Sequence, residues 1–353
     1  MAVDMDRLNT FMGKFVGDLG AGLHAALVIL GDKLGLYKAM AAAGPATPAE
    51  LAKKTGCDER YLLEWLNAMA AGGYVTYDAA KKTYHLSPEQ AFTLADETSP
   101  VYLPGAFQVI ASVMKDEEKI TSAFRTGKGV GWHEHHSDLF VGTERFFRPN
   151  YVANLVANWI PALDGVEARL KAGGSVADIG CGHGASTILM AQAYPKATIT
   201  GFDYHPASIE TAKKRAAEAG VADRVKFEVA PAKGFPGKNY DLVAFFDCLH
   251  DMGDPAGAAK HVFESLAPDG AFMVVEPMAG DSVESNLNPV GRVFYCASTM
   301  ICTPASKAQE VGAALGAQAG EKRLREVLMA GGFKKVRRAA ETPFNLILEA
   351  RRA

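Results

Sequence analysis

Cysteine is scarce in this chain, and its few residues do not form the pattern of a cross-linked or metal-stabilised fold. The 353 residues include five cysteines, an odd number, and none of them belongs to a C-x-x-C pair. Disulfide frameworks and structural zinc sites both depend on such paired spacing. We therefore expect reduced thiols, as in cytoplasmic proteins, and neither a disulfide framework nor a bound metal.

The sequence also lacks an excess of charge of either sign and a signal for export. Its 37 basic and 40 acidic residues give a formal net charge of -3, too little to concentrate a nucleic acid. Asp4 and Asp6 stand where a signal peptide would be basic. Apolar runs such as 25–30 soon meet Asp32 and Lys33, short of a membrane span of about 20 residues. We expect a cytoplasmic protein that acts on a small molecule.

The length and the 48% hydrophobic content predict more than one domain, the first of them helical. Residues 1–100 show helical periodicity and capping signals, followed by a short hairpin with a turn at Asp78. The expected helices are 8–40 with a break at Gly35, 47–54 and 59–71, and the expected hairpin strands are 74–77 and 83–86. This order predicts a helix-turn-helix with a wing.

A winged helix is often a DNA-binding module, so the charges on its second helix decide how it is interpreted. Its long polar residues are Glu59, Arg60, Glu64 and Asn67. With two acidic residues and one basic residue, this helix has a net negative charge that would repel the phosphates of DNA. We expect this domain to mediate homodimer contacts and to cover an active site, and a cofactor-sensing transcriptional regulator remains the alternative.

Residues 101–165 are expected to join the two domains and to cover the active site. Three histidines, His133, His135 and His136, lie within four residues here. A metal site is one interpretation, but adjacent His135 and His136 point apart in a helix or a strand and no fourth ligand is evident. A substrate pocket and a solvated turn are the other two. The residues of this segment expected at the pocket are His133, His135, Phe146, Arg148 and Tyr151.

From residue 166 to the end the pattern changes to short apolar strands that alternate with helices. This alternation predicts an α/β fold, a Rossmann-like seven-stranded sheet with an antiparallel terminal strand. The expected strands are 175–179, 198–202, 225–229, 242–246, 271–275, 334–338 and 345–350, and the expected helices are 185–194, 206–219, 255–266 and 321–330.

A glycine turn, Gly180-Cys-Gly182-His-Gly184, follows the first of these strands. Glycines there let backbone N–H groups approach a ligand that would collide with a Cβ. The turn alone also suits NAD, so an NAD-dependent oxidoreductase is the alternative. Asp178 favours another ligand, because a carboxylate before the turn would repel a pyrophosphate and attract an ammonium. The terminal antiparallel pair also replaces the second half of a dinucleotide fold.

With these motifs in place, residues from about 165 to 353 resemble class I S-adenosylmethionine-dependent methyltransferases. The segment 178–184 matches the first motif of that family, and Asp203 matches the acid that accepts hydrogen bonds from the ribose hydroxyls. Leu249-His250-Asp251 resembles the Leu-His-Asp-Trp segment of small-molecule O-methyltransferases with a winged-helix dimerisation domain. A closer likeness is to bacterial methyltransferases with a Phe146-Phe-Arg-Pro segment. The residues expected to hold S-adenosylmethionine are Asp178, Gly180, Gly182, Gly184, Asp203, Tyr204, Phe246 and Asp247.

The sequence departs from the family at two places. Ala230-Pro231-Ala232 stands where an acid often binds the adenine amino group, so adenine must be held otherwise. Met252 replaces the usual tryptophan, which changes the expected wall of the acceptor pocket. Tyr295 lies in the insertion between the fifth strand and the last helix, which is expected to act as a lid over the acceptor, with a core role as the alternative.

His250 is the expected general base, because its ordinary pKa lies near physiological pH. It follows the fourth strand and Glu276 ends the fifth, so both are expected at the carboxyl edge of the sheet, with Glu276 orienting the imidazole. Asp247 is expected to contact the cofactor or the acceptor. A capping or packing histidine is the alternative for His250. The predicted reaction is methyl transfer to a small molecule, with oxygen expected as the acceptor atom and nitrogen and sulfur left open.

Overall fold

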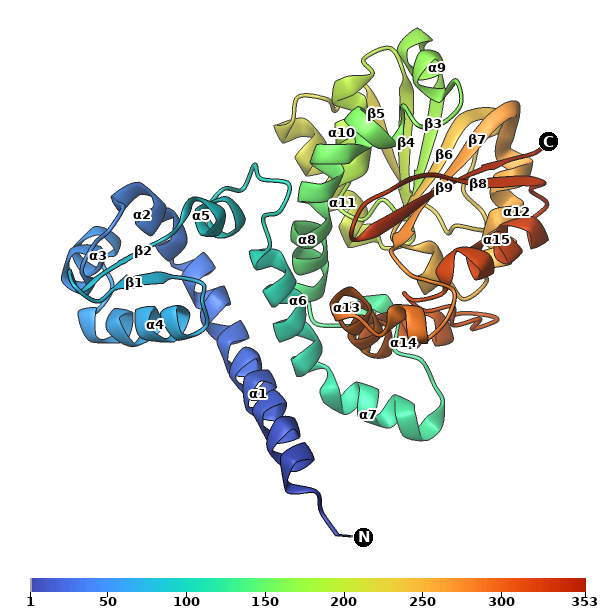
Figure 1. Ribbon diagram of the computed structural model, residues 1–353. Coiled ribbons are helices and arrows are strands. Elements are labelled where there is room, and N and C mark those ends of the chain that lie inside the picture. The colour runs from blue at the N-terminus through green and yellow to red at the C-terminus, as the bar shows by residue number, and fades with distance from the viewer. Residues whose placement is uncertain (1) are drawn as a thin grey trace. The chain divides into compact units, whose positions relative to one another are not determined.

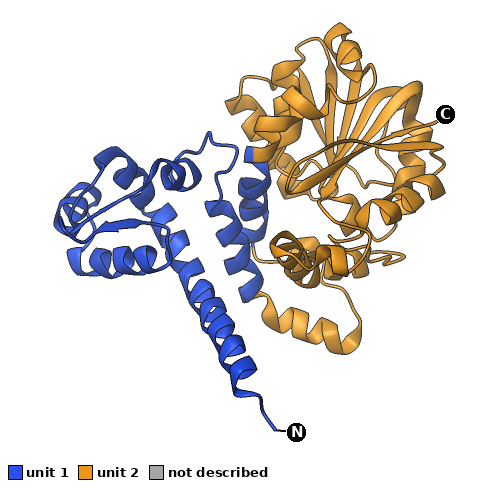
Figure 2. Ribbon diagram, viewed as in Figure 1, with its two compact units in different colours: residues 1–114, 137–149 blue, residues 115–136, 150–353 orange. Residues whose placement is uncertain are grey.

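The computed structural model describes residues 2–353, and they divide into two compact units (Figure 2). Unit 1 contains the residues up to Met114 together with residues 137–149. Unit 2 contains residues 115–136 and 150–353. The segment 101–165, expected as a joint, therefore contributes to both units, and helix α8 (Asp138–Asn154) passes from one to the other.

Unit 1 has the predicted helix-turn-helix with a wing. Its elements are α1 (Met5–Lys33), α2 (Leu36–Ala43), α3 (Pro48–Thr55), α4 (Glu59–Ala71), β1 (Thr76–Asp78), β2 (Thr83–His85), α5 (Pro88–Leu94) and most of α6 (Pro104–Lys115). Gly35 separates α1 from α2 with a φ of 67°, a value that a residue without a Cβ adopts readily. Thr47 and Glu50 cap α3 reciprocally, as their spacing predicts.

A buried cluster at the crossing of the helices holds unit 1 together. Tyr37, Trp65 and Met69 are almost fully buried in it. Trp65 donates a hydrogen bond from its indole nitrogen to the carbonyl of Leu27, 2.8 Å away, so its one polar atom is satisfied. Gly31 is required at the contact of α1 with α4, because a Cβ there would lie 2.5 Å from the Trp65 ring.

The first two thirds of α1 carry large apolar side chains that are exposed to solvent. Phe11, Phe15, Leu19 and Leu23 are each more than half exposed. By length and composition this 29-residue helix could cross a membrane, although exported and buried helices pass the same test. The expectation that apolar runs stay short of a membrane span is therefore corrected, because α1 continues without a break from Met5 to Lys33 and its apolar stretch extends beyond the run 25–30.

Unit 2 contains a seven-stranded sheet of the order β5-β4-β3-β6-β7-β9-β8 (Figure 1). The strands are β3 (Ser175–Ile179), β4 (Thr198–Asp203), β5 (Val225–Val229), β6 (Tyr240–Phe246), β7 (Leu266–Pro277), β8 (Lys335–Glu341) and β9 (Asn345–Arg351). The first five are parallel, and β9 is antiparallel to both β7 and β8. The predicted fold class is confirmed, and successive strands are added on opposite sides of β3, so that the strand order reverses between β3 and β6.

The four helices that the sequence predicts between the strands of unit 2 are present, and further helices lie before the sheet and after β7. They are α7 (Glu117–Thr126), α9 (Val166–Ala172), α10 (Ala185–Ala193), α11 (Pro206–Glu218), α12 (Pro255–Ser265), α13 (Pro289–Ala297), α14 (Thr303–Lys307) and α15 (Gly320–Ala330). Short 3-10 turns occur at η1 (Trp132–Glu134), η3 (Leu249–Asp251) and η4 (Glu284–Asn286), and π-helical turns at η2 (Leu155–Trp159) and η5 (Ser298–Cys302). Val243, Phe245, Phe272 and Val274 form the buried centre of the sheet.

Candidate active site

Acidic side chains gather at the carboxyl edge of the parallel strands in unit 2. Asp178 lies on β3, Asp203 ends β4, Asp247 follows β6, and Glu276 lies near the end of β7. Neighbouring parallel strands end at one edge of a sheet, and open sheets of this kind bind their ligands there. The candidate site therefore lies at the edge where β4, β3, β6 and β7 end.

Asp178 is completely buried beneath the start of α10. Ser186 and Thr187 each donate a hydroxyl hydrogen bond of 2.6 Å to its Oδ2 atom. Its Oδ1 atom has no hydrogen-bond partner among residues 2–353. Burial raises the pKa of Asp178 to about 6, although the two hydroxyls oppose the rise. The site thus holds a buried carboxyl group with one free oxygen, which a cationic ligand would satisfy.

The glycine turn after β3 uses left-handed backbone conformations at all three glycines. The φ values are 72° at Gly180, 52° at Gly182 and 82° at Gly184. A Cβ on Gly180 would lie 2.9 Å from Cys248 Sγ, whereas a Cβ on Gly182 would point into open space. The turn therefore leaves room above Gly182 for a ligand to approach the backbone closely.

Asp203 is tied to this turn through the backbone. Its Oδ2 atom accepts a hydrogen bond from Gly182 N, and its Oδ1 atom accepts one from His205 N, both at 2.9 Å. Burial raises the pKa of Asp203, while the two backbone N–H groups oppose the rise. The next residue, Tyr204, is about half exposed, and its ring packs edge-on against His133 with centroids 6.2 Å apart.

Asp247 is the most constrained residue of the edge. Its φ of 50° is left-handed, a conformation that few residues other than glycine adopt without local support. Tyr151 donates a hydrogen bond of 2.6 Å to its Oδ2, and Asn345 donates one of 2.7 Å to its Oδ1. Burial and the charge of Glu276 raise the pKa of Asp247 to about 7. The ring of Tyr151 also packs on Phe246, with centroids 5.3 Å apart.

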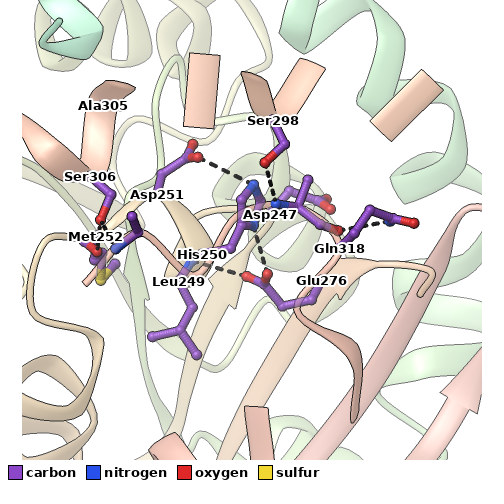
Figure 3. Close-up of polar contacts among 12 residues, drawn as sticks. Asp247, Leu249, His250, Asp251, Met252, Glu276, Ser298, Ala305, Ser306 and Gln318 are labelled. Atoms are coloured by element: carbon purple, nitrogen blue, oxygen red, sulfur yellow. Dashed lines mark hydrogen bonds and ion pairs between the residues drawn. The ribbon is translucent and has the colours of Figure 1, made fainter. Parts of the chain in front are cut away.

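His250 lies between two carboxyl groups (Figure 3). Its Nδ1 atom is 2.6 Å from Glu276 Oε2, and its Nε2 atom is 3.3 Å from Asp251 Oδ1. Glu276 is held in turn by the N–H of Leu249, which donates to Oε1 at 3.0 Å. Burial favours a neutral imidazole, but Glu276 and Asp251 outweigh it and raise the pKa of His250 well above its ordinary value.

The charge on His250 bears on its expected role as a general base. A base must present an unprotonated nitrogen, and an imidazole between two carboxylates is held as the imidazolium. The contact of Glu276 with His250 fits the expected orientation of the ring. The role of His250 as a proton acceptor remains a prediction, because Asp251 stands beside the nitrogen that would act.

The residues expected from the connecting segment and the insertion lie in different places. His133 is exposed, whereas His135 is buried with its Nδ1 atom 3.0 Å from Asp116 Oδ2. Phe146 and Arg148 lie on the part of α8 that belongs to unit 1. Tyr295 is half-buried on α13. Of this group, Tyr151 donates a hydrogen bond to Asp247, and His133 contacts Tyr204 through its ring and a backbone hydrogen bond.

Two residues that the sequence did not single out belong to the site. Asn345 begins β9 and is paired in register with Pro277 at the end of β7, which places its amide beside Asp247. Cys302 ends η5 and interacts with both His250 and Asp251. Neither residue has a motif of its own. An antiparallel pairing of the last strand with the fifth would have indicated Asn345.

Comparison with known proteins supports the two-part architecture. Residues 170–328 match the family model described as a methyltransferase domain, and residues 22–96 match the Rv2258c-like winged HTH domain. Curated relatives include the 27-O-demethylrifamycin SV methyltransferase of Amycolatopsis mediterranei, 36% identical over 31% of this chain and 43% of its own length. The trans-aconitate 2-methyltransferase of Delftia acidovorans is 36% identical over 29% of this chain and 37% of its own. The match thus spans less than half the length of these relatives.

Solved structures share the fold over nearly the whole chain. The human N-acetylserotonin methyltransferase in complex with SAM has a TM-score of 0.72 and 15% identity, and the alignment covers 99% of each chain. The mitomycin 7-O-methyltransferase MmcR has a TM-score of 0.67 and 20% identity, over 99% of this chain and 100% of that one. This chain therefore contains a match to a methyltransferase domain and a match to a winged helix-turn-helix domain, the two parts that its motifs predict, and it shares its fold with these solved structures.

Proposed function

We propose that this protein transfers a methyl group from S-adenosylmethionine to a small-molecule acceptor. The observation that carries the proposal is the free, buried Oδ1 atom of Asp178 beside the open glycine turn. The amino-acid end of the cofactor has an ammonium group that can satisfy this oxygen. Asp203, fixed by two backbone N–H groups, keeps further lone pairs for ribose hydroxyls.

The same residues are unsuited to NAD. A pyrophosphate above Gly182 would approach the buried carboxyl group of Asp178, and like charges repel strongly where burial lowers the dielectric constant. The antiparallel strand β9 also occupies the position where a dinucleotide fold continues with parallel strands. The oxidoreductase alternative is therefore disfavoured on both electrostatic and topological grounds.

When bound, S-adenosylmethionine supplies an electrophilic methyl group on a sulfonium centre. The task of the chain is to align the acceptor with that group and to exclude water. Phe246 and Tyr151 provide buried apolar surface at the edge, and the hydrogen bond from Tyr151 holds Asp247 in place. His250 and Glu276 form the polar side of the proposed acceptor pocket.

Oxygen is the acceptor atom that we propose. An oxygen nucleophile must lose its proton, and His250, oriented by its contact with Glu276, is the group that we propose to accept it. The relatives named above methylate different molecules, and their matched segments are too short to assign one of them to this chain.

Calorimetry on the full-length protein tests the proposal directly. We expect S-adenosylmethionine and S-adenosylhomocysteine to bind and NAD not to bind. Binding of NAD without either sulfur compound would overturn the assignment. Replacing His250→Ala then separates the acceptor atoms: an oxygen acceptor predicts a fall in kcat of about 10²–10⁴, whereas activity that survives the change rules out His250 as an obligatory base.

The remaining proposals concern assembly and location. We propose a cytoplasmic homodimer formed through the N-terminal domain, in which the exposed apolar face of α1 is covered by a second copy. Arg60 on α4 lies within ion-pair distance of Glu64, at 2.5 Å, which leaves this helix poorly suited to bind phosphates. Sedimentation at several concentrations tests the dimer, and partition into lipid vesicles instead would identify α1 as a membrane helix.

A further inference from the structure

Three side chains with metal-binding atoms meet where η3 lies against the end of η5. His250 and Asp251 are neighbours on η3, and Cys302 is the last residue of η5. One nitrogen, one carboxylate oxygen and one sulfur atom of these residues all lie within 4.8 Å of one another. Cys302 and His250 are buried. The π-helical turn of η5 is itself notable, because such turns are rare and are frequent at functional sites.

The spacing of the two adjacent donors fits a tetrahedral metal ion. His250 Nε2 and Asp251 Oδ1 are 3.3 Å apart. Two ligands bound to zinc at about 2.0–2.1 Å in tetrahedral geometry are separated by about 3.3 Å. The contact lacks the geometry of a hydrogen bond, because Asp251 Oδ1 has no hydrogen-bond partner among the described residues. The pair is thus spaced as ligands of one ion would be.

Glu276 provides the outer contact that zinc-binding histidines usually have. Its Oε2 atom lies 2.6 Å from His250 Nδ1, and its Oε1 atom is fixed by the N–H of Leu249. A carboxylate on one ring nitrogen fixes the tautomer, so that the other nitrogen directs its lone pair at the metal. In this arrangement Nε2 faces Asp251 with its orientation already set.

Two buried polar atoms in this region are left without hydrogen-bond partners within residues 2–353. They are Asp251 Oδ1 and His135 Nε2. An unpaired buried polar atom costs about 1–3 kcal/mol, and an ion or a water molecule is its usual explanation. His135 lies close enough for its charge to act on the Asp251 carboxyl group. Its side chain is fully buried against Asp116.

We propose that His250, Asp251 and Cys302 bind one zinc ion. A thiolate, an imidazole and a carboxylate are the ligands that zinc accepts in proteins, and three protein ligands leave a fourth position open. The site goes beyond the proposed methyl transfer, and its existence does not depend on that reaction. The metal would occupy the Nε2 lone pair that a general base needs, so zinc binding and proton transfer by His250 exclude each other, and the zinc-bound protein would be a state in which His250 cannot act as the base.

Metal binding can be measured on the full-length protein with Zn²⁺ alone. The protein is stripped with a chelator and titrated with Zn²⁺ in competition with a chromophoric chelator. We expect one equivalent to bind. Glu276→Gln is expected to weaken the binding of Zn²⁺ by about 10–100-fold, because it removes the contact that orients the histidine ligand. Cys302→Ser is expected to weaken the binding of Zn²⁺ more, because it removes a ligand itself. Cys296→Ser is the matched control, because Cys296 is an exposed thiol on α13.

Cobalt supplies a second readout, and its first measurement is made on the unmodified protein. Co²⁺ bound to the unmodified protein is expected to give a thiolate charge-transfer band that Cys302→Ser lacks and Cys296→Ser keeps. Less than one tenth of an equivalent of zinc, or an affinity unchanged by Cys302→Ser, would overturn the proposal. Binding of S-adenosylhomocysteine is measured on the same samples, so that a missing zinc site is distinguished from failure of the proposed methyl transfer.

Discussion

Replacing Asp178→Asn is expected to stabilise the free protein at neutral pH while weakening its hold on the cofactor. The buried carboxyl group has a pKa of about 6, compared with 3.8 for an exposed aspartate. The folded state therefore holds this proton more tightly than the unfolded state does. Stability from this group is fully present below pH 3.8 and is lost as the pH rises to about 6, at a cost of about 3 kcal/mol. The asparagine cannot ionise, so it avoids this cost.

The packing around the site should survive the replacement. The oxygen of the asparagine can accept the hydroxyl hydrogen bonds of Ser186 and Thr187 as Oδ2 of Asp178 does. In a domain of 150–250 residues, 1 kcal/mol shifts the melting temperature by about 2–4 °C. We therefore expect Asp178→Asn to melt about 6–12 °C above the unmodified protein at pH 7 and at nearly the same temperature at pH 4.

Thermal unfolding at both pH values, with calorimetric titration of S-adenosylhomocysteine, measures both effects. Loss of a hydrogen bond to a charged group costs about 1.5–3 kcal/mol, which is about a 10–150-fold loss of affinity. Asp223→Asn is the matched control, because Asp223 is an exposed acid outside the site and should change neither quantity. The reasoning is refuted if the stability difference is the same at pH 4 and pH 7, or if the variant binds the ligand as well as the unmodified protein.

Two further substitutions test the turn and the strained aspartate. Gly182→Val places a side chain in the open space above the glycine turn, at a residue with a φ of 52°. We expect calorimetry to show about a 100-fold weaker binding of S-adenosylhomocysteine. An unchanged affinity would contradict the proposal that the ligand occupies this space. Tyr151→Phe removes the hydroxyl group that donates a hydrogen bond to Asp247 Oδ2. We expect urea unfolding to show that the free energy of unfolding falls by about 1–3 kcal/mol. Tyr61→Phe is the control, because Tyr61 is exposed and its replacement should leave the free energy of unfolding unchanged.

The sheet could be predicted from the sequence because each strand has a local signal. Short apolar runs between turn residues located β3 to β6 within one or two residues, and Gly180 to Gly184 located the first turn. The prediction shortened β7, which begins at Leu266, because Asp269 and Gly270 interrupt its apolar pattern. The register shift between β6 and β7 accommodates that polar start.

The candidate site was predicted in part, because some of its contacts join residues far apart in the sequence. Asp178, Asp203 and Glu276 lie on strands, so parallel pairing alone brings their ends together. Asn345 and Cys302 reach the site through an antiparallel strand and a π-helical turn, and no spacing rule connects them with His250. Their contribution depends on tertiary packing, which a sequence pattern does not contain.

The acidic edge of the sheet has an electrostatic consequence for cofactor binding. Burial raises the pKa values of Asp178 and Asp247 to about 6 and about 7, and that of Asp203 also rises. The carboxyl groups of Asp178 and Asp247 are therefore partly protonated near neutral pH in the free protein. A ligand that brings an ammonium and a sulfonium favours their ionised forms, so its binding must lower these pKa values and release protons.

Proton release can be measured as the dependence of the calorimetric binding enthalpy on the ionisation enthalpy of the buffer. We expect S-adenosylmethionine to release a fraction of a proton at pH 6–7, and S-adenosylhomocysteine, which lacks the sulfonium charge, to release less. Asp178→Asn should reduce the release for both ligands, because it removes one of the groups that titrate. If proton uptake were observed instead, the carboxyl groups would not be the partners of the cationic ligand, because cation binding to an acid cannot raise its pKa.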